Sequence, residues 1–307
     1  MSNNKNKDNV SRREFVKKAA FYGAAGVGLF GLAATPLLKR DTGDSFKDLF
    51  QKHYSKLNEA ELKIILKKLE EKTKEQYGAV VQIDDDKPIK DVIFGYALNL
   101  DVCIGCRKCV HACVEENNQS RDPAIEYIRV LELDKGGFNL EHAEHKYEHE
   151  VPREGKFYMP VQCHQCENPP CVKVCPTKAT WQEPDGITVV DYNWCIGCRY
   201  CQAACPYYAR RFNFFKPEIK AEEVNPRQSY LGNRIRPAGV IEKCTFCIQR
   251  TRRGLMPACL EACPTGARKF GDLTDQQSSV RYILENKNVY VFKEELGTIP
   301  RFFYYFD

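Results

Sequence analysis

Sixteen cysteines are the side chains of this sequence best suited to chemistry, and their spacing divides all of them into four groups of four. The first and third groups have identical offsets, whereas the second and fourth each contain one longer gap. The groups are Cys103-x2-Cys106-x2-Cys109-x3-Cys113, Cys163-x2-Cys166-x4-Cys171-x3-Cys175, Cys195-x2-Cys198-x2-Cys201-x3-Cys205 and Cys244-x2-Cys247-x11-Cys259-x3-Cys263. Because thiolates are soft metal ligands, clustered thiols at repeated offsets predict metal centres.

The offsets favour iron–sulfur clusters over single metal ions. In a Cys-x2-Cys-x2-Cys loop three thiolates converge on one small inorganic core, and the fourth cysteine, after a further x3 step, is directed at a second cluster. Gly105 and Gly197 stand inside the two tightest loops, where the lack of a Cβ lets backbone amides approach sulfur closely. Proline follows Cys175, Cys205 and Cys263, and we expect it to end a short helix there.

Three other uses of cysteine fit the offsets less well. Structural zinc takes Cys-x2-Cys pairs separated by a loop, and not three cysteines in one tight run followed by Cys-Pro. Disulfides would suit an exported protein, but bridges between cysteines so close in sequence would be strained. Covalent haem needs Cys-x-x-Cys-His, and the residues after Cys109 and Cys166 are Val110 and Glu167. No covalent haem is expected.

The amino-terminal segment, residues 1–40, resembles an export signal. Arg12 and Arg13 precede Phe15 and then an uncharged, Ala/Gly-rich run over 19–38. Paired arginines before a weakly hydrophobic tract are typical of the twin-arginine signal, which exports folded proteins. A single membrane-spanning helix is the alternative, but the glycines make this run a poor one. We therefore expect the protein on the periplasmic face of the cytoplasmic membrane.

The remaining chain is expected to be soluble and to divide into three parts. Hydrophobic residues make up 43% and charged residues 28% of the chain, and the mean hydropathy is −0.50, which excludes a polytopic membrane protein and a wholly disordered chain. We predict a helical extension and linker over 41–95, a cysteine-rich domain over 96–275 with an insertion over 118–160, and a carboxy-terminal tail over 276–307.

Hydrophobic periodicity predicts the elements around the cysteines. Two amphipathic helices are predicted between 41 and 77, the second starting at Glu59 after a capping box of Asn58 and Glu61. The predicted strands and hairpin cover 92–101, 125–131, 179–190 and 289–292. The aromatic run 302–306 is too short to span a membrane. It either folds back on the domain or contacts a partner.

The cysteine groups as a whole resemble the four-cluster iron–sulfur electron-transfer subunits of the molybdoenzyme superfamily. The second group contains Asn168-Pro169-Pro170-Cys171, and the fourth contains Pro257-Ala258-Cys259. DMSO reductase, polysulfide reductase, tetrathionate reductase, formate-dependent nitrite reductase and sulfite-reduction membrane complexes carry such a subunit. The resemblance covers residues 96–273 and all sixteen ligand positions. It implies an α+β fold of two bacterial-ferredoxin-like two-cluster units related by an internal repeat, with an N-terminal helical extension and an insertion.

The same resemblance implies which cysteines share a cluster. Groups one and four pair, as do groups two and three, and each group lends its last cysteine to its partner group. The four implied [4Fe-4S] clusters would be held by Cys103, Cys106, Cys109 and Cys263 (set A), by Cys244, Cys247, Cys259 and Cys113 (set B), by Cys163, Cys166, Cys171 and Cys205 (set C), and by Cys195, Cys198, Cys201 and Cys175 (set D). No ligand position holds tryptophan, so a three-iron cluster is not expected.

Nothing in the sequence resembles a substrate site: no Gly-rich phosphate loop, Ser/His/Asp set or paired-carboxylate signature stands out. We interpret the chain as a non-catalytic electron-transfer subunit of an exported, membrane-associated respiratory oxidoreductase. The resemblance implies an integral quinone-binding membrane subunit as one partner and a molybdopterin or multihaem cytochrome subunit as the other, with no nucleic acid. A free-standing soluble polyferredoxin and a zinc-stabilised exported assembly module are the alternatives.

Three basic residues, Arg199, Lys243 and Arg268, are close to predicted ligands in sequence. Each is a candidate for raising a cluster's reduction potential, with a solvated surface position as the alternative.

Five histidines fall near or between the cysteine groups. His111 and His164 lie inside cysteine loops and are expected to hydrogen-bond near a cluster. On a helix, His142, His145 and His149 would share one face and offer a site for metal or haem iron. The charged residues around them favour a solvated loop instead.

Overall fold

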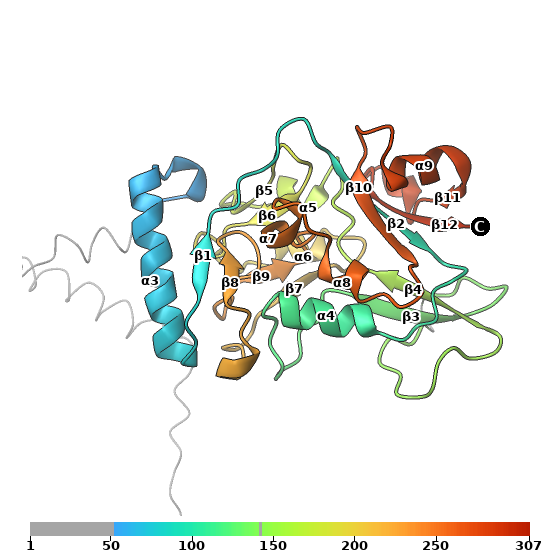
Figure 1. Cartoon of the computed structure of the whole chain (residues 1–307), viewed down its shortest axis with the longest axis horizontal. Helices are drawn as coiled ribbons and strands as arrows, with labels where there is room; N and C mark the ends of the chain where they lie inside the picture. The colour runs from blue at the N-terminus through green and yellow to red at the C-terminus, as the bar shows by residue number, and fades with distance from the viewer. Residues whose placement is uncertain (1–51, 141–142) are drawn as a thin grey trace, which may run out of the picture. The chain divides into compact units, whose positions relative to one another are not determined.

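The fold was obtained as a computed structural model that describes residues 52–140 and 143–307 (Figure 1). The predicted signal segment, residues 1–40, lies outside the described residues, and so do residues 41–51, where the first predicted helix begins. No helix in the two described ranges is both long enough and apolar enough to cross a membrane.

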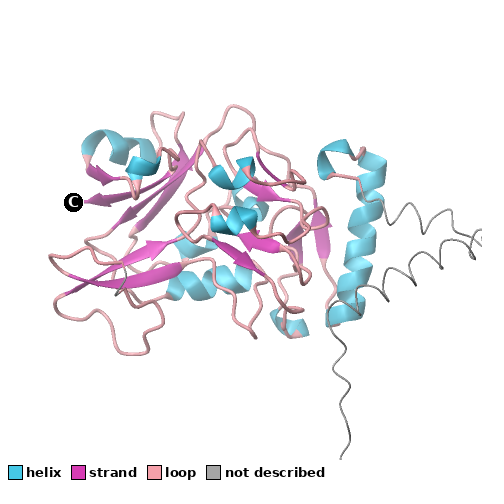
Figure 2. Cartoon of the chain, turned by 180° about the vertical axis from the view of Figure 1, so that it is seen from behind, coloured by secondary structure: helices cyan, strands magenta, loops and turns pink. Residues whose placement is uncertain are grey.

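Helices in the described ranges are mostly single turns joined by loops (Figure 2). Within these ranges only α3, α4 and α9 are eight residues or longer. The α-helices are α3 (Glu59–Tyr77), α4 (Lys108–Glu116), α5 (Pro170–Lys173), α6 (Tyr200–Ala203), α7 (Ile248–Thr251), α8 (Ala258–Glu261) and α9 (Ser279–Asn286). The 3-10 turns are η1 (Tyr54–Lys56), η2 (Ala221–Glu223) and η3 (Glu294–Leu296).

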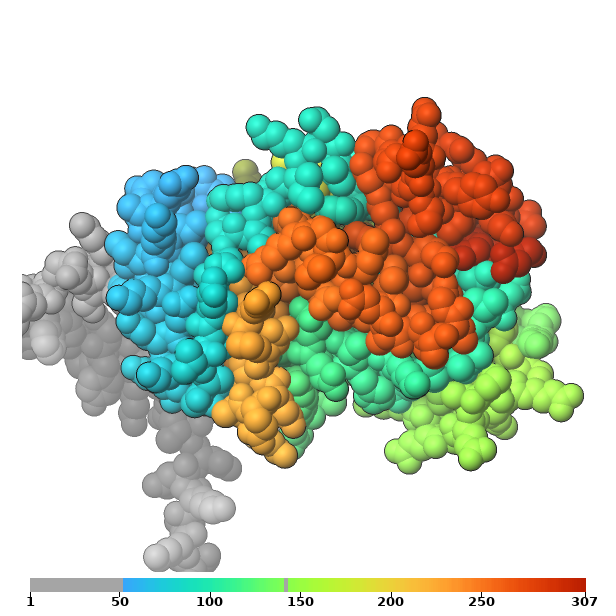
Figure 3. All heavy atoms as spheres, in the orientation of Figure 1, coloured from blue at the N-terminus to red at the C-terminus, as the bar shows by residue number. Residues whose placement is uncertain are grey.

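Helix α3 begins where its capping residues predict. The Asn58 side chain accepts a hydrogen bond from the Glu61 backbone N–H, and the Glu61 carboxylate accepts one from the Asn58 N–H. Such a reciprocal cap stabilises a helix start by about 1 kcal/mol. The helix ends at Gly78, which is left-handed with φ +70°. It packs against β1 at one end of the described body, opposite the carboxy-terminal segment (Figure 3).

The strands of the described residues form four two-stranded ladders and one four-stranded sheet. The ladders pair β1 (Gln82–Asp84) with β8 (Arg227–Ser229), β3 (Arg129–Asp134) with β4 (Lys156–Val161), β5 (Thr180–Gln182) with β6 (Thr188–Val190), and β7 (Arg210–Phe212) with β9 (Ile241–Lys243). The sheet has the order β10 (Arg268–Asp272), β2 (Phe94–Asn99), β12 (Phe302–Phe306), β11 (Asn288–Tyr290). The predicted hairpin over 179–190 is confirmed, with an antiparallel register of Thr180 opposite Val190.

The aromatic run at the carboxyl end is an inner strand of the sheet. β12 runs parallel to β2, with Phe302 opposite Tyr96, and β11 pairs with its other edge. The rings of Tyr96 and Phe302 stack with centroids 4.9 Å apart, and both residues are fully buried. A pair of this kind contributes roughly 0.5–1.5 kcal/mol beyond the burial of its surface. The tail therefore folds back on the domain and closes the core beside β2, the strand that leads to the first cysteine.

The strand predicted over 125–131 was placed too early. β3 starts at Arg129, because the backbone before it is bonded to side chains rather than to a neighbouring strand. The N–H of Tyr127 donates to the Gln119 side chain, and the carbonyl of Glu126 accepts from Arg211. The strands predicted over 92–101 and 289–292 are present in shorter form, as β2 and β11.

Candidate metal centres

Paired short helices hold most of the cysteine groups. α4 carries Cys109 and Cys113, and it packs against α8, which carries Cys259. In the same way α5, with Cys171, packs against α6, with Cys201. These two contacts bring group one to group four and group two to group three.

Two glycines let the chain turn within the tightest loops. Gly105 and Gly197 have φ of +71° and +69°, a left-handed conformation that costs other residues energy. Space is also short, because a Cβ on Gly105 would lie 2.3 Å from a ring carbon of Tyr158. Both observations explain why glycine occupies these positions. The backbone hydrogen bond from Gly105 to the Cys103 thiol agrees with the expected approach of backbone amides to sulfur.

Two sets of thiols surround separate cavities. The first cavity is lined by all four cysteines of set A together with Arg268. The second is lined by all four cysteines of set C together with Arg210 and His164. In each cavity three thiols come from one group, and the fourth is the last cysteine of the partner group.

The set B thiols are the most deeply buried. Burial raises the pKa of Cys113, and the nearby thiols of Cys247, Cys244 and Cys259 raise it further. The Asn117 side-chain amide lies 3.5 Å from Cys113 Sγ and 3.7 Å from Cys247 Sγ, so one side chain spans thiols of two groups. All four members of this set lie together beneath the surface.

The set D thiols lie nearer to solvent. Burial raises the pKa of Cys201, and Cys195 and Cys175 are among the thiols close enough to add to that effect. Cys198 is the exposed member. The structure thus gathers members of each implied set, while their assignment as iron ligands stays a prediction.

The four sets follow one another in the order A, B, C, D. Arg268 contacts Cys109 of set A and Cys259 of set B, at N–S distances of 3.2 and 3.9 Å. Burial raises the pKa of Cys244 of set B to about 12, and Cys163 of set C is the next largest cause. After burial and Arg210, Cys171 of set C is the strongest influence on Cys201 of set D. Each set is therefore adjacent to the next.

Side chains that donate hydrogen bonds to sulfur come from residues that the sequence analysis missed, apart from Arg268. Arg210 Nη2 lies 3.1 Å from Cys171 Sγ, and Gln119 Nε2 lies 3.2 Å from Cys113 Sγ. The sequence could have identified Arg210, because Arg210 follows Cys205 by five positions and the candidate Arg268 follows Cys263 by the same five positions. No comparable pattern marks Asn117 or Gln119.

The other two basic candidates have different partners. Lys243 is fully buried, but its ammonium donates to the backbone carbonyl of Cys244 at 2.7 Å and not to a thiol. The Arg199 guanidinium lies over the rings of Phe212 and Phe214, 5.3 and 5.8 Å from their centroids. Among the three, only Arg268 bonds to sulfur.

The donor sets fit anionic inorganic clusters. Sixteen thiols lie in four adjoining sets, and two of these sets surround cavities that also contain a buried guanidinium. Arg210 Nη1 is buried without a hydrogen-bond partner. Since a buried cationic N–H without a partner is costly, an acceptor beside Arg210 would satisfy it, as the sulfur of a cluster does. Within the described ranges no three His, Cys, Asp or Glu side chains are grouped tightly enough to hold a single metal ion.

The described histidines do not come together in a site of their own. Residues 143–149 are not helical, so His145 and His149 do not share a helix face, and His142 lies outside the described residues. His149 Nε2 instead hydrogen-bonds Glu132 at 2.7 Å. His111 is exposed on α4. His164 is buried in the set C cavity, where Nδ1 donates to the Gln162 carbonyl and its ring stacks on Tyr207 at 4.0 Å.

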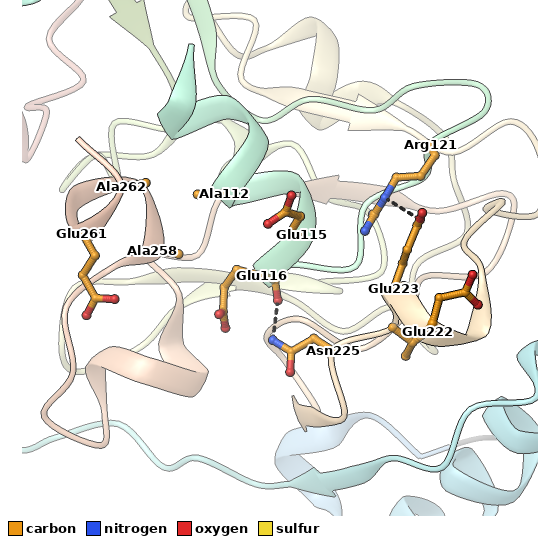
Figure 4. Close-up of a pocket in the computed structure, with 11 residues that line it drawn as sticks. Ala112, Glu115, Glu116, Arg121, Glu222, Glu223, Asn225, Ala258, Glu261 and Ala262 are labelled. Carbon is orange, nitrogen blue, oxygen red and sulfur yellow. Dashed lines mark hydrogen bonds and ion pairs between the residues drawn. The ribbon is translucent and has the colours of Figure 1, made fainter. Parts of the chain in front are cut away.

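A further cavity lies on the surface beside α4 and α8 and is lined by no thiol (Figure 4). Glutamates from α4, η2 and α8 line it, and Arg121 forms an ion pair with Glu223 at 3.4 Å across one side. Glu116 is held by Arg250 at 3.3 Å. Because these ion pairs already hold Glu116 and Glu223, we interpret this cavity as a solvated acidic surface.

Comparison with known proteins agrees with the thiol arrangement. Two family models, both described as a 4Fe-4S dicluster domain, match residues 102–180 and residues 155–224 with 231–273. The chain is 35% identical to a selenate reductase subunit of Mesobacillus selenatarsenatis, over 96% of this chain and 97% of that protein. It is 36% identical to the iron–sulfur cluster-binding subunit of menaquinone reductase from Nitratidesulfovibrio vulgaris, over 69% and 88% of the two proteins. It is also 36% identical to a polysulfide reductase subunit of Wolinella succinogenes, over 68% and 92%.

Proposed function

This chain belongs to the family of 4Fe-4S dicluster iron–sulfur subunits of respiratory reductases, and we propose that it carries single electrons between two other subunits of a membrane-associated complex. The observation that carries this proposal is the arrangement of sixteen cysteines in four adjoining sets. Sixteen thiolates fit four [4Fe-4S] clusters.

Sets A, B, C and D are the ligand sets of this proposal. When bound, a [4Fe-4S] cluster takes up and returns one electron without making or breaking a bond in a substrate. The chain supplies the thiolates, keeps neighbouring sets in contact and limits the access of water. Set B is buried throughout, whereas set D reaches the surface at Cys198. That exposed thiol makes set D a natural point of exchange with a partner.

Two ferredoxin-like units related by an internal repeat are part of the same proposal. Strands β5, β7 and β10 each start five residues after the last cysteine of a group, namely Cys175, Cys205 and Cys263. Each of these strands then pairs with an antiparallel neighbour. The recurrence of this short helix, Cys-Pro and strand supports a repeat.

The proposed partners are an integral quinone-binding subunit and a catalytic subunit of the molybdopterin or multihaem cytochrome type. One relative is named as a subunit of menaquinone reductase, which supports the quinone side. Relatives named for selenate and polysulfide support a catalytic subunit that reduces a terminal acceptor. We also propose export through the twin-arginine pathway to the periplasmic face of the membrane, on the strength of Arg12 and Arg13.

Purification of the untagged chain from detergent-solubilised membranes, with an antibody, tests this function. We expect a membrane subunit and a larger catalytic subunit to co-purify, and we expect added quinol to reduce clusters detected by electron paramagnetic resonance (EPR). Recovery of the chain alone from the soluble fraction, with reducible clusters, would instead identify a free-standing polyferredoxin. A colourless, zinc-containing preparation would identify a zinc-stabilised module.

A further inference from the structure

Two fully buried arginines occupy equivalent positions in the cysteine framework. Arg210 ends the segment Cys205-Pro-Tyr-Tyr-Ala-Arg, and Arg268 ends the segment Cys263-Pro-Thr-Gly-Ala-Arg. Each arginine is the first residue of a strand, β7 or β10, and their exposed fractions are 2% and 3%. The last cysteine of a group therefore determines where each guanidinium is placed.

The two guanidinium groups make the same contact in different sets. Arg210 Nη2 lies 3.1 Å from Cys171 Sγ, and Arg268 Nη2 lies 3.2 Å from Cys109 Sγ. Cys171 and Cys109 are each the third cysteine of their group. Arg268 follows Cys263, which lines the set A cavity with Cys109, and Arg210 follows Cys205, which lines the set C cavity with Cys171. Each arginine therefore contacts a thiol of the same set as the cysteine that precedes it.

Sets B and D have other residues at the equivalent position. Asn118 follows Cys113 by five residues, and Thr180 follows Cys175 by five. Neutral amides of Asn117 and Gln119 contact Cys113 in set B, and the Thr177 hydroxyl contacts Cys175 in set D at 3.7 Å. The only cationic contact to a set B thiol among the described residues is the longer one, 3.9 Å, from Arg268 to Cys259.

Neither arginine has a protein carboxylate as its counter-charge. The ion pairs of the described residues include buried Arg236 with Glu242 and buried Arg252 with Glu183 and Asp185, but not Arg210 or Arg268. Burial of an uncompensated cation is unfavourable. The negative charge that compensates both arginines must therefore come from the thiolates and from what they bind.

We propose that Arg210 and Arg268 are redox-tuning residues, which raise most strongly the reduction potentials of the clusters held by sets C and A. Reduction adds one negative charge to a cluster. A buried cation that donates a hydrogen bond to a ligand sulfur stabilises the reduced form more than the oxidised form, because the interior screens charge weakly. This inference rests on the proposed function.

The order of the sets gives the tuning a pattern. Sets A and C, which have the short arginine contacts of 3.2 and 3.1 Å, alternate with sets B and D along the row. An electron therefore passes between the two kinds of site at every step. Because the contacts are local, loss of one guanidinium changes one potential strongly and leaves the more distant potentials nearly unchanged.

Potentiometric titration of the purified holo-complex, monitored by EPR, tests the tuning. In Arg210→Gln, one of the four midpoint potentials should shift to more negative values by more than the other three, and in Arg268→Gln a different one should do so. Arg210→Lys and Arg268→Lys keep the charge but lose the planar fork, and should restore part of each shift. Lys269→Gln is the matched control for Arg268, since it removes one charge at the adjacent position of the same strand, and it should retain the wild-type potentials. Arg211→Gln removes the charge next to Arg210 on β7, but Arg211 also lies near Cys205, so it should shift the set C potential less than Arg210→Gln does.

Iron and acid-labile sulfide are measured in every variant. If a glutamine variant loses a cluster, the lysine variant at the same position is used instead. It should retain the cluster, and the midpoint potential of that cluster should still differ from the wild-type value. The proposal is overturned if potentials are unchanged, if the same cluster shifts most in both arginine variants, or if the controls shift equally. If the wild-type protein has four reducible clusters but the variants keep the wild-type midpoint potentials, the arginines do not tune the clusters. The proposed electron-transfer function would still hold in that case.

Discussion

Gly197 packs so closely against Gly239 that a Cβ on Gly197 would lie 2.1 Å from the Gly239 carbonyl oxygen. Gly197 has a φ of +69° and stands between Cys195 and Cys198 of set D. Gly197→Ala should therefore displace this loop, lower the melting temperature and reduce the iron content by up to one cluster. The backbone conformation costs alanine about 1–2 kcal/mol, and the overlap adds about 1–3 kcal/mol.

Gly254→Ala separates these two contributions. Gly254 also has a positive φ, +79°, but nothing lies within 4 Å of an added Cβ. This variant should show only the conformational cost and keep its full iron content. Equal melting temperatures for the two variants would mean that the contact with Gly239 does not constrain the set D loop.

Cys205→Ser should alter the cluster of set C although Cys205 belongs to the third group in sequence. Its thiol lines the same cavity as Cys163, Cys166 and Cys171. EPR spectra of Cys205→Ser should therefore match those of Cys163→Ser and differ from those of Cys195→Ser, which removes a ligand of set D. A match with Cys195→Ser would show that the last cysteine stays with its own group.

Glu132 should make the stability of the protein sensitive to acid. Burial alone would raise the pKa of this carboxyl group, but hydrogen bonds from His149 and Tyr158 and the charge of Arg153 outweigh burial, so its pKa lies below the usual value. A carboxylate whose pKa is lower in the folded state than in the unfolded state stabilises the fold at pH values above its unfolded-state pKa. This stabilisation is lost as the pH falls through the folded-state pKa. Glu132→Gln should lower the melting temperature at pH 7, with a difference that shrinks in acid.

Asp134→Asn provides the comparison for Glu132. Asp134 lies on the same strand and pairs with Lys156 at 2.6 Å, but its side chain is 78% exposed. Exposed ion pairs contribute about 0–1 kcal/mol, so this variant should melt close to the wild-type temperature at every pH. If the melting temperature of Glu132→Gln stays below the wild-type value by the same amount in acid, the charge of Glu132 is not the cause of the difference.

Export should depend on the arginine pair. In the double variant Arg12→Lys and Arg13→Lys, we expect the chain to stay in the cytoplasmic fraction with its clusters bound, because a receptor reads the pair and not the charge alone. Lys17→Arg and Lys18→Arg are charge-neutral controls that should be exported. Fractionation followed by immunoblotting measures both, and unchanged export of the double variant would rule out the twin-arginine route.

The cysteine framework could be read from the sequence because it depends on local spacing. The same holds for the hairpin over 179–190 and for the capping box of Asn58 and Glu61, since short-range hydrogen bonds determine both. The partnership of groups one and four is non-local. It was implied only by resemblance, and in the structure it follows from the packing of α4 on α8.

Features that depend on distant contacts were missed or misplaced. Gln119 lies outside any cysteine group, yet it bonds both the Cys113 thiol and the Tyr127 backbone, and the latter bond keeps residue 127 out of β3. The aromatic run at 302–306 has the composition of a strand, but its place between β2 and β11 depends on the pairing of segments about 200 residues apart, as between Phe302 and Tyr96. Periodicity along the chain carries no information on such partners.

Iron and acid-labile sulfide per chain, determined on anaerobically purified full-length protein together with a titration of free thiols, show whether all sixteen cysteines hold iron–sulfur clusters. We expect about sixteen irons and about sixteen sulfides, with no cysteine reacting until the clusters are removed. A preparation without labile sulfide, or one whose cysteines are oxidised in pairs, would show that the cysteines do not hold four [4Fe-4S] clusters.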